Sequence, residues 1–259
     1  MATYKKRGYK PKTKKEKEEV EEVIDGHSTT EEVFNTLDES ASKTEDWVIA
    51  NQKYIFGIIG VVAVVVLGYL GYNEFLAKPQ QTEAMNEMFQ AKKYFNEAVT
   101  GTEKDSLYTL ALNGGNGKMG MVDIASEYSG TSAGNLANYY AGMAYLNLKD
   151  YKNAVSYLSD FSSDDQVLSA MAKGGIGDAF IQLNQAKDAL GYYEQAAKIK
   201  TNEFTTPMFL LKAGTTAMEL GEMDKALTYF NQIKENYPSS SQAANVDVLI
   251  GKATVLAKK

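Results

Sequence analysis

The sequence has no cysteine and a single histidine, His27, among its 259 residues. The lack of cysteine excludes disulfide bonds, thiolate metal sites and thiol catalysis. One histidine removes most catalytic triads and histidine metal sites as well. No paired carboxylates, metal-binding loop or nucleophile elbow replaces them. We therefore predict that the protein is not an enzyme and has no catalytic, cofactor-binding or metal-ligating residues.

The chain also has few prolines and no excess of positive charge. The net charge is -6, which is not typical of a nucleic-acid-binding protein. From Thr82 onward the only prolines are Pro207 and Pro238, and the apolar residues recur at helical spacing without strand-like alternation. Glycine and polar clusters interrupt this pattern near residues 100–104, 113–117, 129–134, 162–166, 200–206 and 237–241. The fold class predicted from this pattern is all-α, with helices of about 10–20 residues joined by short turns.

The segment GGNGKMG places Gly115, Gly117 and Gly120 at the G-x-G-x-x-G spacing of dinucleotide-binding loops. Such a loop needs a preceding strand that directs it at a phosphate, and the preceding DSLYTLALN is helical in pattern. We predict a flexible turn between helices.

One long stretch, Tyr54 to Tyr72, has no charged side chain. As a helix, 19 residues measure about 28 Å, close to the hydrocarbon thickness of a bilayer. A cleaved export signal would be shorter and nearer the N-terminus, and a soluble core helix rarely stays apolar on every face for this length. Tyrosine and phenylalanine at both ends fit the membrane interfaces. We predict an uncleaved transmembrane helix, with its flanks, over residues 47–76.

The segment before it is divided by charge. Residues 1–17 have eight basic side chains and one acidic, whereas residues 18–46 have eleven acidic and one basic. Such blocks predict a solvated, disordered tail over residues 1–46. An alternative is that the basic end contacts anionic lipid or ribosomal RNA. A short charged tail and a long translocated domain favour a cytoplasmic N-terminus and an external C-terminal domain.

Three stretches in the C-terminal part align without gaps: AGMAYLNLKDYKNAVSYL, IGDAFIQLNQAKDALGYY and AGTTAMELGEMDKALTYF. Gly142, Gly177 and Gly214 coincide, at offsets of 35 and 37 residues. Further coinciding sets are Leu148, Leu183 and Leu220; Ala154, Ala189 and Ala226; Tyr157, Tyr192 and Tyr229; and Leu158, Tyr193 and Phe230. The small residue lets a second helix cross the first closely, the alanine packs there, and the aromatic fills the gap to the next repeat. Since no single hairpin buries its own apolar face, the repeats must stack.

These stretches resemble tetratricopeptide repeats in period and in their small–aromatic–alanine–aromatic pattern. The resemblance implies a solenoid of helical hairpins. A weaker echo, IASEYSGTSAG against IKENYPSSSQAA, indicates an eroded repeat before Gly130. We predict degenerate repeat-like helices over residues 80–132, three repeats over residues 133–238 and a capping helix over residues 239–259.

In tetratricopeptide arrays the first helices line a groove that binds peptides or partner helices. Transferred by register, the predicted groove residues are Leu136, Tyr139, Tyr140, Met143, Asn147, Asp178, Ile181, Gln182, Leu211, Lys212, Thr215, Met218 and Glu219. Gly174 falls in the same register and is followed by Gly175. Each of these glycines lowers the stability of a helix by about 1 kcal/mol relative to alanine. Close helix packing or a bound ligand would compensate. Some tetratricopeptide domains bind the C-terminal carboxylate of a peptide with lysines and asparagines in the groove. Because Lys212 is the sole cation among the groove residues, such binding is disfavoured, and apolar protein segments fit better. The alternative is that several of these residues only pack between repeats.

The architecture from about residue 40 onward resembles the YfgM-like ancillary subunits of the bacterial Sec translocon. The resemblance implies a single-pass inner-membrane protein with a periplasmic repeat domain. Its protein partners would be translocon subunits, chaperones or exported chains, and self-association remains open. The alternative is a structural scaffold of another envelope assembly, for secretion, motility or wall synthesis.

Within the apolar stretch, the glycines lie on one side of the expected helix. At 100° per residue, Gly57, Gly60, Gly68 and Gly71 fall within about 80°, with Val64 between them. Small residues permit close approach of helices in membranes. We predict that this face packs against a partner span or a second copy.

Overall fold

The computed structural model describes the backbone of residues 29–258 and the side chains from residue 44. Within these residues the regular structure is helical, and the sole strand-like feature is an isolated bridge between Gly115 and Lys118. The chain divides into two units, residues 1–70 and residues 71–259. The predicted all-α fold is confirmed.

The first unit consists, in its described part, of helix α2 (Thr29–Tyr72). It begins within the charged segment of residues 1–46, whose disorder stays a prediction. No glycine or proline occurs between Thr29 and Phe56, so nothing in the backbone ends a helix there. Residues 1–28, where the rest of the tail prediction falls, lie outside the described residues.

The helical backbone continues past Tyr72, where the predicted apolar segment ends. A π-helical turn, η1 (Asn73–Ala77), leads into α3 (Lys78–Thr100), and the Lys78 N–H donates to the Asn73 carbonyl. Pro79 in the first turn of α3 has no N–H and its ring crowds the carbonyl four residues earlier. The wider π turn just before it accommodates that ring without ending the helix.

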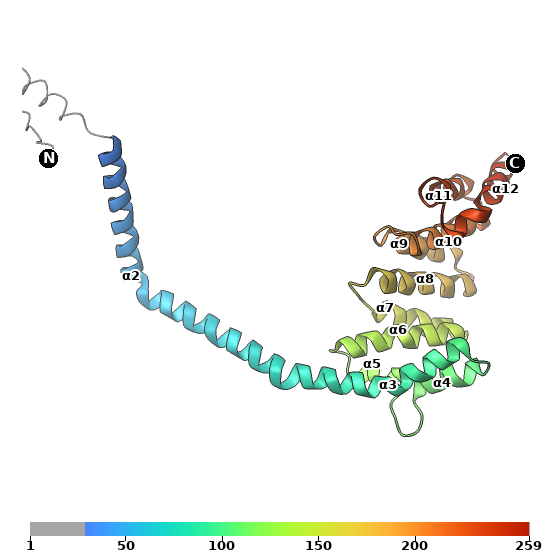
Figure 1. Ribbon diagram of the computed structural model, residues 1–259, viewed down its shortest axis with the longest axis horizontal. Helices are drawn as coiled ribbons and strands as arrows, with labels where there is room; N and C mark the ends of the chain where they lie inside the picture. Colours follow the sequence, from blue (N-terminus) through green and yellow to red (C-terminus); the bar gives the residue numbers. More distant parts are fainter. Residues whose placement is uncertain (1–28, 259) are drawn as a thin grey trace, which may run out of the picture. The chain divides into compact units, whose positions relative to one another are not determined.

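Six helices of the second unit form three antiparallel hairpins that follow one another along the chain (Figure 1). The hairpins are α6 (Ser132–Asn147) with α7 (Tyr151–Asp160), α8 (Gln166–Gln182) with α9 (Ala186–Lys198), and α10 (Thr205–Glu219) with α11 (Met223–Asn236). Each second helix also packs on the first helix of the next hairpin. These hairpins coincide with the three repeats predicted from the sequence.

The turn inside each hairpin has the same geometry. The residues after the aligned leucines, Lys149, Asn184 and Gly221, have φ of 64°, 59° and 79°. The next N–H then donates to a carbonyl five residues earlier, at 2.8–2.9 Å. This left-handed C-terminal turn satisfies the last helical carbonyls and reverses the chain. The gapless alignment is therefore reproduced in the backbone.

The aligned glycines lie where the two helices of a hairpin cross. A Cβ atom at Gly142, Gly177 or Gly214 would approach within 2.4–2.6 Å of a side chain of the second helix. The side chains in question are Leu158, Tyr193 and Phe230, the last aligned set. The predicted close crossing is confirmed, and the aligned alanines are fully buried beside it.

The aromatic set Tyr157, Tyr192 and Tyr229 differs from expectation. Tyr157 stacks on Tyr145 and Tyr192 on Phe180, with ring centroids 5.4 Å apart in both pairs. These partners belong to the first helix of the same hairpin, so the rings reinforce a hairpin and do not fill the gap to the next repeat. The third hairpin has Ala217 in place of the partner ring, and there the Tyr229 hydroxyl donates to Glu194 Oε1 at 2.5 Å.

Further helices that do not form complete repeats precede and follow the three hairpins along the chain. Helices α3, α4 (Lys104–Asn113) and α5 (Met121–Glu127) precede them, and η2 (Ser241–Asn245) with α12 (Val246–Leu256) follows. The predicted echo is present: the Thr131 and Ser240 hydroxyls each donate to a tyrosine carbonyl three residues earlier, at 2.8 Å. Ala91 of α3 is fully buried, as are the aligned alanines of the three hairpins.

One local prediction is corrected. The loop Gly114–Gly120 is tied to α3, because Asn116 Nδ2 donates to the Tyr94 hydroxyl at 2.9 Å and Lys118 lies 3.1 Å from a Glu87 oxygen. It is therefore an anchored turn and not a flexible one. At the start of α10, Asn202 Oδ1 accepts hydrogen bonds from the backbone N–H groups of Phe204 and Thr205, so Asn202 fixes the chain as it enters the helix.

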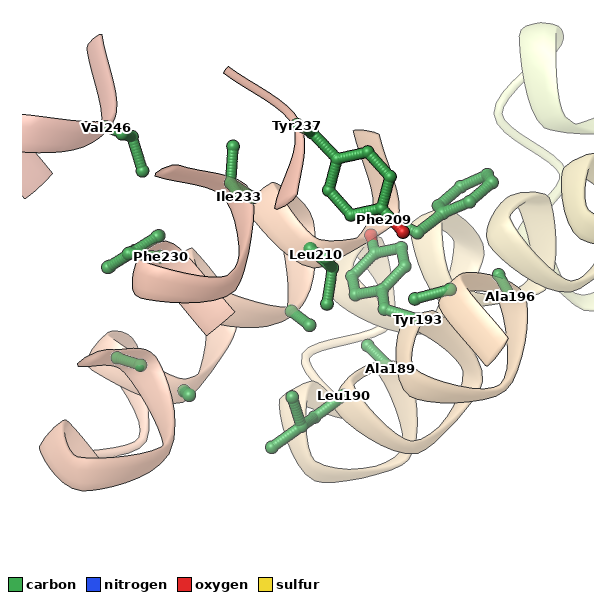
Figure 2. Packing of buried hydrophobic residues seen from close by; sticks show 14 of the residues in the cluster. Ala189, Leu190, Tyr193, Ala196, Phe209, Leu210, Phe230, Ile233, Tyr237 and Val246 are labelled. Atoms are coloured by element: carbon green, nitrogen blue, oxygen red, sulfur yellow. The ribbon is translucent and has the colours of Figure 1, made fainter. Parts of the chain in front are cut away.

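The core of the second unit consists of apolar clusters between successive helices. The largest cluster includes Tyr193, Phe209, Phe230 and Tyr237, from α9, α10, α11 and the residue after it (Figure 2). A separate cluster joins α3, α4, α5 and α6. A small third cluster around Leu158 and Ile176 connects α7 with α8. The core is thus distributed along the array, as stacking of repeats requires.

Candidate protein-binding surface

The first helices α6, α8 and α10 are neighbours in the second unit, and α3 lies against α6. The predicted groove residues all lie on these three helices. We call these residues the first-helix surface; they are Leu136, Tyr139, Tyr140, Met143, Asn147, Asp178, Ile181, Gln182, Leu211, Lys212, Thr215, Met218 and Glu219.

Tyr139 and Tyr140 of α6 belong to a chain of aromatic rings. Tyr140 meets Phe95 edge-on at a centroid distance of 5.0 Å, and Tyr139 meets Phe161 at 5.2 Å. The Lys92 ammonium lies 5.7 Å from the Tyr140 centroid, within range of a cation–π interaction. Burial raises the pKa of the Tyr139 hydroxyl above its usual value. Both tyrosines are half-buried, and they connect α6 to α3 and to the loop after α7.

The apolar members of the first-helix surface also contribute to packing. Met143 packs against the Leu158 cluster. Ile181, Leu211 and Met218 pack against the largest cluster. Each is only partly buried, so each keeps some accessible area. Leu136 borders an open hollow of about 530 Å³ with neighbours from the loop between α7 and α8.

A polar cluster connects the second and third repeats. Lys212 Nζ lies 2.6 and 2.7 Å from the two Asp178 carboxylate oxygens. The Tyr193 hydroxyl donates to the same carboxylate at 2.6 Å, and Lys212 Nζ lies 5.6 Å from the Tyr193 ring centroid. Burial, followed by the hydrogen bond to Asp178, raises the pKa of Tyr193 well above its usual value of 10.0. The charges of Asp178 and Lys212 thus neutralise each other on the surface.

The polar members at the helix ends are accessible. Asn147, Gln182 and Glu219 are exposed and lie five residues after the covered glycines. Asn147 Nδ2 donates to the Met143 carbonyl, and Gln182 accepts from the Tyr151 hydroxyl at 3.4 Å. Thr215 is half-buried and its hydroxyl donates to carbonyls of its own helix. Accessible polar atoms are therefore concentrated at one end of each first helix.

Gly174 and Gly175 are explained by packing. A Cβ atom at Gly174 would lie 1.9 Å from a ring carbon of Phe209, and one at Gly175 would lie 3.0 Å from Leu158. Phe209 is fully buried, so its ring occupies the position that a ligand would need. Of the two explanations left open by the sequence, close helix packing is the one observed.

Sequence reasoning missed the contacts that three aromatic residues make with this surface: half-buried Phe161 and the buried Tyr193 and Phe209. Tyr193 belongs to the set aligned with Phe230, which marked it as a packing residue but not as a partner of Asp178. Phe209 lies 35 residues after Gly174, whereas the second and third repeats are 37 residues apart, so their register did not pair the two residues. Phe161 gave no comparable signal, because its ring partner, Tyr139, lies on a separate helix, α6.

The described residues contain no group of three or more histidine, cysteine, aspartate or glutamate side chains that could hold a metal ion. His27 lies outside them.

The glycine face predicted in the apolar segment is open. At Gly57, Gly60, Gly68 and Gly71 a Cβ atom would meet no other atom within 4 Å, and Val64 is 70% exposed. Nothing in the described chain covers this face, and its role in helix packing stays a prediction.

Comparison with known families supports the repeat assignment. The family model described as tetratricopeptide repeat matches residues 136–164 and 209–240. These ranges correspond to the first and third hairpins, and the second hairpin, with the same turn and the same covered glycine, lies between them. A search among curated proteins finds no match to the chain. The chain contains tetratricopeptide repeats, which imply a scaffold for protein–protein interaction.

Proposed function

We propose that the protein is a membrane-anchored scaffold, without enzymatic activity, whose tetratricopeptide repeats bind protein partners at the outer face of the cytoplasmic membrane. One observation carries the anchoring. The helical segment Thr44–Thr100 contains an 18-residue window with a mean hydropathy of 2.4, and none of that window is buried within the chain. By length and composition this helix can cross a bilayer.

The energetic cost of leaving this segment in water supports the anchor. A dozen large apolar side chains between Tyr54 and Leu70 are 49–74% exposed. Full burial of one such side chain is worth about 1.5–3 kcal/mol, so a dozen would contribute roughly 20–30 kcal/mol. That exceeds the total stability of an ordinary domain, about 5–15 kcal/mol. A lipid environment removes this cost.

The composition of the first-helix surface supports protein ligands. It combines half-buried Tyr and Met side chains with exposed amides, and the charges of Asp178 and Lys212 cancel. Aromatic and methionine side chains with few free charges are typical of surfaces that bind apolar protein segments. Tethering such a surface to the membrane raises its local concentration near membrane-bound partners.

Within this function we favour an ancillary role at the Sec translocon, with partners among its subunits, chaperones and exported chains. The charge division of residues 1–46 supports a cytoplasmic N-terminus and an external repeat domain. Protease treatment of spheroplasts tests this orientation: the repeat domain should be degraded without lysis. Protection until the membrane is permeabilised would contradict the external location.

Cross-linking mass spectrometry, with the helix intact in mild detergent, identifies the partners. Recovery of translocon or chaperone subunits is the expected result. Recovery of another envelope assembly instead, for secretion, motility or wall synthesis, would replace the translocon role with the structural-scaffold alternative.

A further inference from the structure

We propose that Asn116 is a site of spontaneous deamidation, at which the side-chain amide is converted to a carboxylate in the folded protein. Asparagine is one of the chemically labile side chains, and it reacts fastest before glycine, which has no Cβ atom to hinder attack by its own backbone nitrogen. The sequence contains two such dipeptides. Asn113–Gly114 ends α4, and Asn116–Gly117 lies in the loop before α5. The structure permits the reaction at the second and opposes it at the first.

The reaction requires only water. The Gly117 backbone nitrogen attacks Cγ of Asn116, so that a C–N bond forms and the bond from Cγ to Nδ2 breaks. The proton from the attacking nitrogen ends on the departing ammonia. Water then opens the five-membered succinimide ring at either of its carbonyl carbons, which gives aspartate or isoaspartate. The net change is one water consumed and one ammonia released.

Asn116 and Gly117 are the central residues of an open turn. Their φ angles are 55° and 71°, and the Lys118 N–H donates to the Gly115 carbonyl at 3.1 Å. These are the features of a type I′ turn, for which Asn-Gly is a preferred pair. Both central residues are exposed, and no carbonyl in the described part of the chain accepts a hydrogen bond from the Gly117 N–H. The attacking nitrogen is therefore accessible to water and free of a competing bond.

The first dipeptide lies in closed surroundings. Asn113 is the last residue of α4, and the Gly114 N–H donates to the Leu110 carbonyl at 2.9 Å. A Cβ atom at Gly114 would lie 2.1 Å from the Lys118 carbonyl oxygen, whereas one at Gly117 would meet no atom within 4 Å. Attack on Asn113 requires breaking the hydrogen bond of Gly114 and opening this turn. We expect it to be at least about tenfold slower than attack on Asn116.

The leaving group of the reaction is also the anchor of the loop. Asn116 Nδ2 donates to the hydroxyl of the buried Tyr94 at 2.9 Å. This bond is lost when ammonia departs, so it slows the reaction as long as it is present. Tyr94 therefore protects the amide, and removing its hydroxyl should accelerate deamidation by roughly two- to tenfold.

Deamidation loosens the loop from α3. The product has no amide to donate to Tyr94, and isoaspartate adds one backbone atom, which disrupts the type I′ turn. The remaining tie is the ion pair of Lys118 with Glu87, and an exposed ion pair stabilises little. Amide hydrogen exchange in residues 114–120 should therefore increase once Asn116 has reacted.

Peptide mapping of the full-length protein in detergent tests the assignment. Both dipeptides lie in the tryptic peptide of residues 105–118, so fragmentation of this peptide after incubation at neutral pH compares them directly. A mass increase of one dalton should appear at Asn116 at least about tenfold faster than at Asn113, with isoaspartate among the products. In concentrated urea the two sites should react at similar rates, because the difference comes from the fold.

Two variants test the role of the anchor. Tyr94→Phe should accelerate the reaction at Asn116, whereas Tyr108→Phe, which removes the hydroxyl of another buried tyrosine, should leave the rate unchanged. Equal rates at Asn113 and Asn116 in the folded protein, or no product at Asn116, would overturn the proposal. A rate in Tyr94→Phe equal to that of the wild type would contradict the protection by Tyr94. The inference goes beyond the proposed function, and failure of the spheroplast or cross-linking experiments would leave it standing.

Discussion

Glycine occurs within helices in both units of the chain, in opposite surroundings. In the repeats, Gly142, Gly174, Gly177 and Gly214 lie so close to a neighbouring side chain that a Cβ atom would clash. In the apolar helix, Gly57, Gly60, Gly68 and Gly71 have no neighbour within 4 Å. A glycine inside a helix costs about 1 kcal/mol relative to alanine. Close packing within the chain compensates that cost in the repeats, and we expect a partner helix to compensate it in the apolar segment.

Filling a covered glycine should have the largest effect. In Gly174→Leu the new side chain would displace the buried Phe209 ring, whose nearest carbon lies 1.9 Å from the Cβ position. Overpacking of this kind costs about 3 kcal/mol, so the repeat domain should unfold at a markedly lower temperature. Circular dichroism during heating measures the shift.

The matched control is Gly191→Ala in α9, where no atom lies within 4 Å of the Cβ position. There the gain in helix propensity should stabilise the domain by about 0.5–1 kcal/mol. Equal effects of the two substitutions would show that the covered and open glycines do not differ.

The open glycines of the apolar helix should matter for association and not for stability of the repeats. Gly60→Leu with Gly68→Leu should leave membrane insertion intact, because leucine is apolar. Interhelical contacts in membranes contribute about 1–2 kcal/mol, so co-purification of a partner or a second copy should fall by roughly 5–30-fold. Quantitative pull-down measures it, and unchanged recovery would contradict the predicted packing face.

Removing the hydroxyl of Tyr193, whose ring lies over Gly177, tests what the hydroxyl adds to the packing of the ring. Tyr193→Phe keeps the ring over the glycine but loses the 2.6 Å hydrogen bond to Asp178. We expect a loss of about 1 kcal/mol at neutral pH. The pKa of Tyr193 is raised above its unfolded value of 10.0, so the folded state keeps its proton at pH values where the unfolded state has released it.

The stability of the wild-type protein should therefore fall as the pH rises above 10, by about 1.4 kcal/mol per pH unit for this group. The variant should lose that part of the slope. Urea denaturation between pH 9 and pH 11.5 provides the test, and identical slopes for the two proteins would exclude a role for this hydroxyl.

The smallest effect on stability is expected at the exposed ends of the first helices. Replacing Asn147, Gln182 and Glu219 together by alanine should change the free energy of unfolding by no more than about 0.5 kcal/mol per site, because all three side chains are exposed. If the first-helix surface binds partners, pull-down recovery should nevertheless fall several-fold. A stable variant with full recovery would place the binding elsewhere.

Much of the repeat architecture could be predicted because its signals are local and periodic. The register of Gly142, Gly177 and Gly214 identified both the hairpin turns and the close crossing of the two helices at each glycine. A helix with period 3.6 places the same positions on the same face in every copy, so three copies reinforce one another. The apolar segment was identifiable for a similar reason, since its length and lack of charge need no tertiary information.

Contacts between residues that are far apart in the sequence were not predicted. Tyr139 and Tyr140 were assigned to a groove, and the structure shows that their rings also bridge to Phe161 and Phe95. The Gly114–Gly120 loop is anchored by Tyr94 and Glu87, more than 20 residues earlier in the chain. No periodic pattern in the sequence connects such residues.

By itself, the sequence determined the all-helical fold, the number and register of the complete repeats and the long apolar helix, because each follows from side-chain spacing along one helix. Only the tertiary structure decided that Phe209 occupies the space beside Gly174 and that Asp178 binds Lys212 and Tyr193. These features arise where different helices meet, and the spacing within one helix does not specify which side chain of its neighbour it will touch.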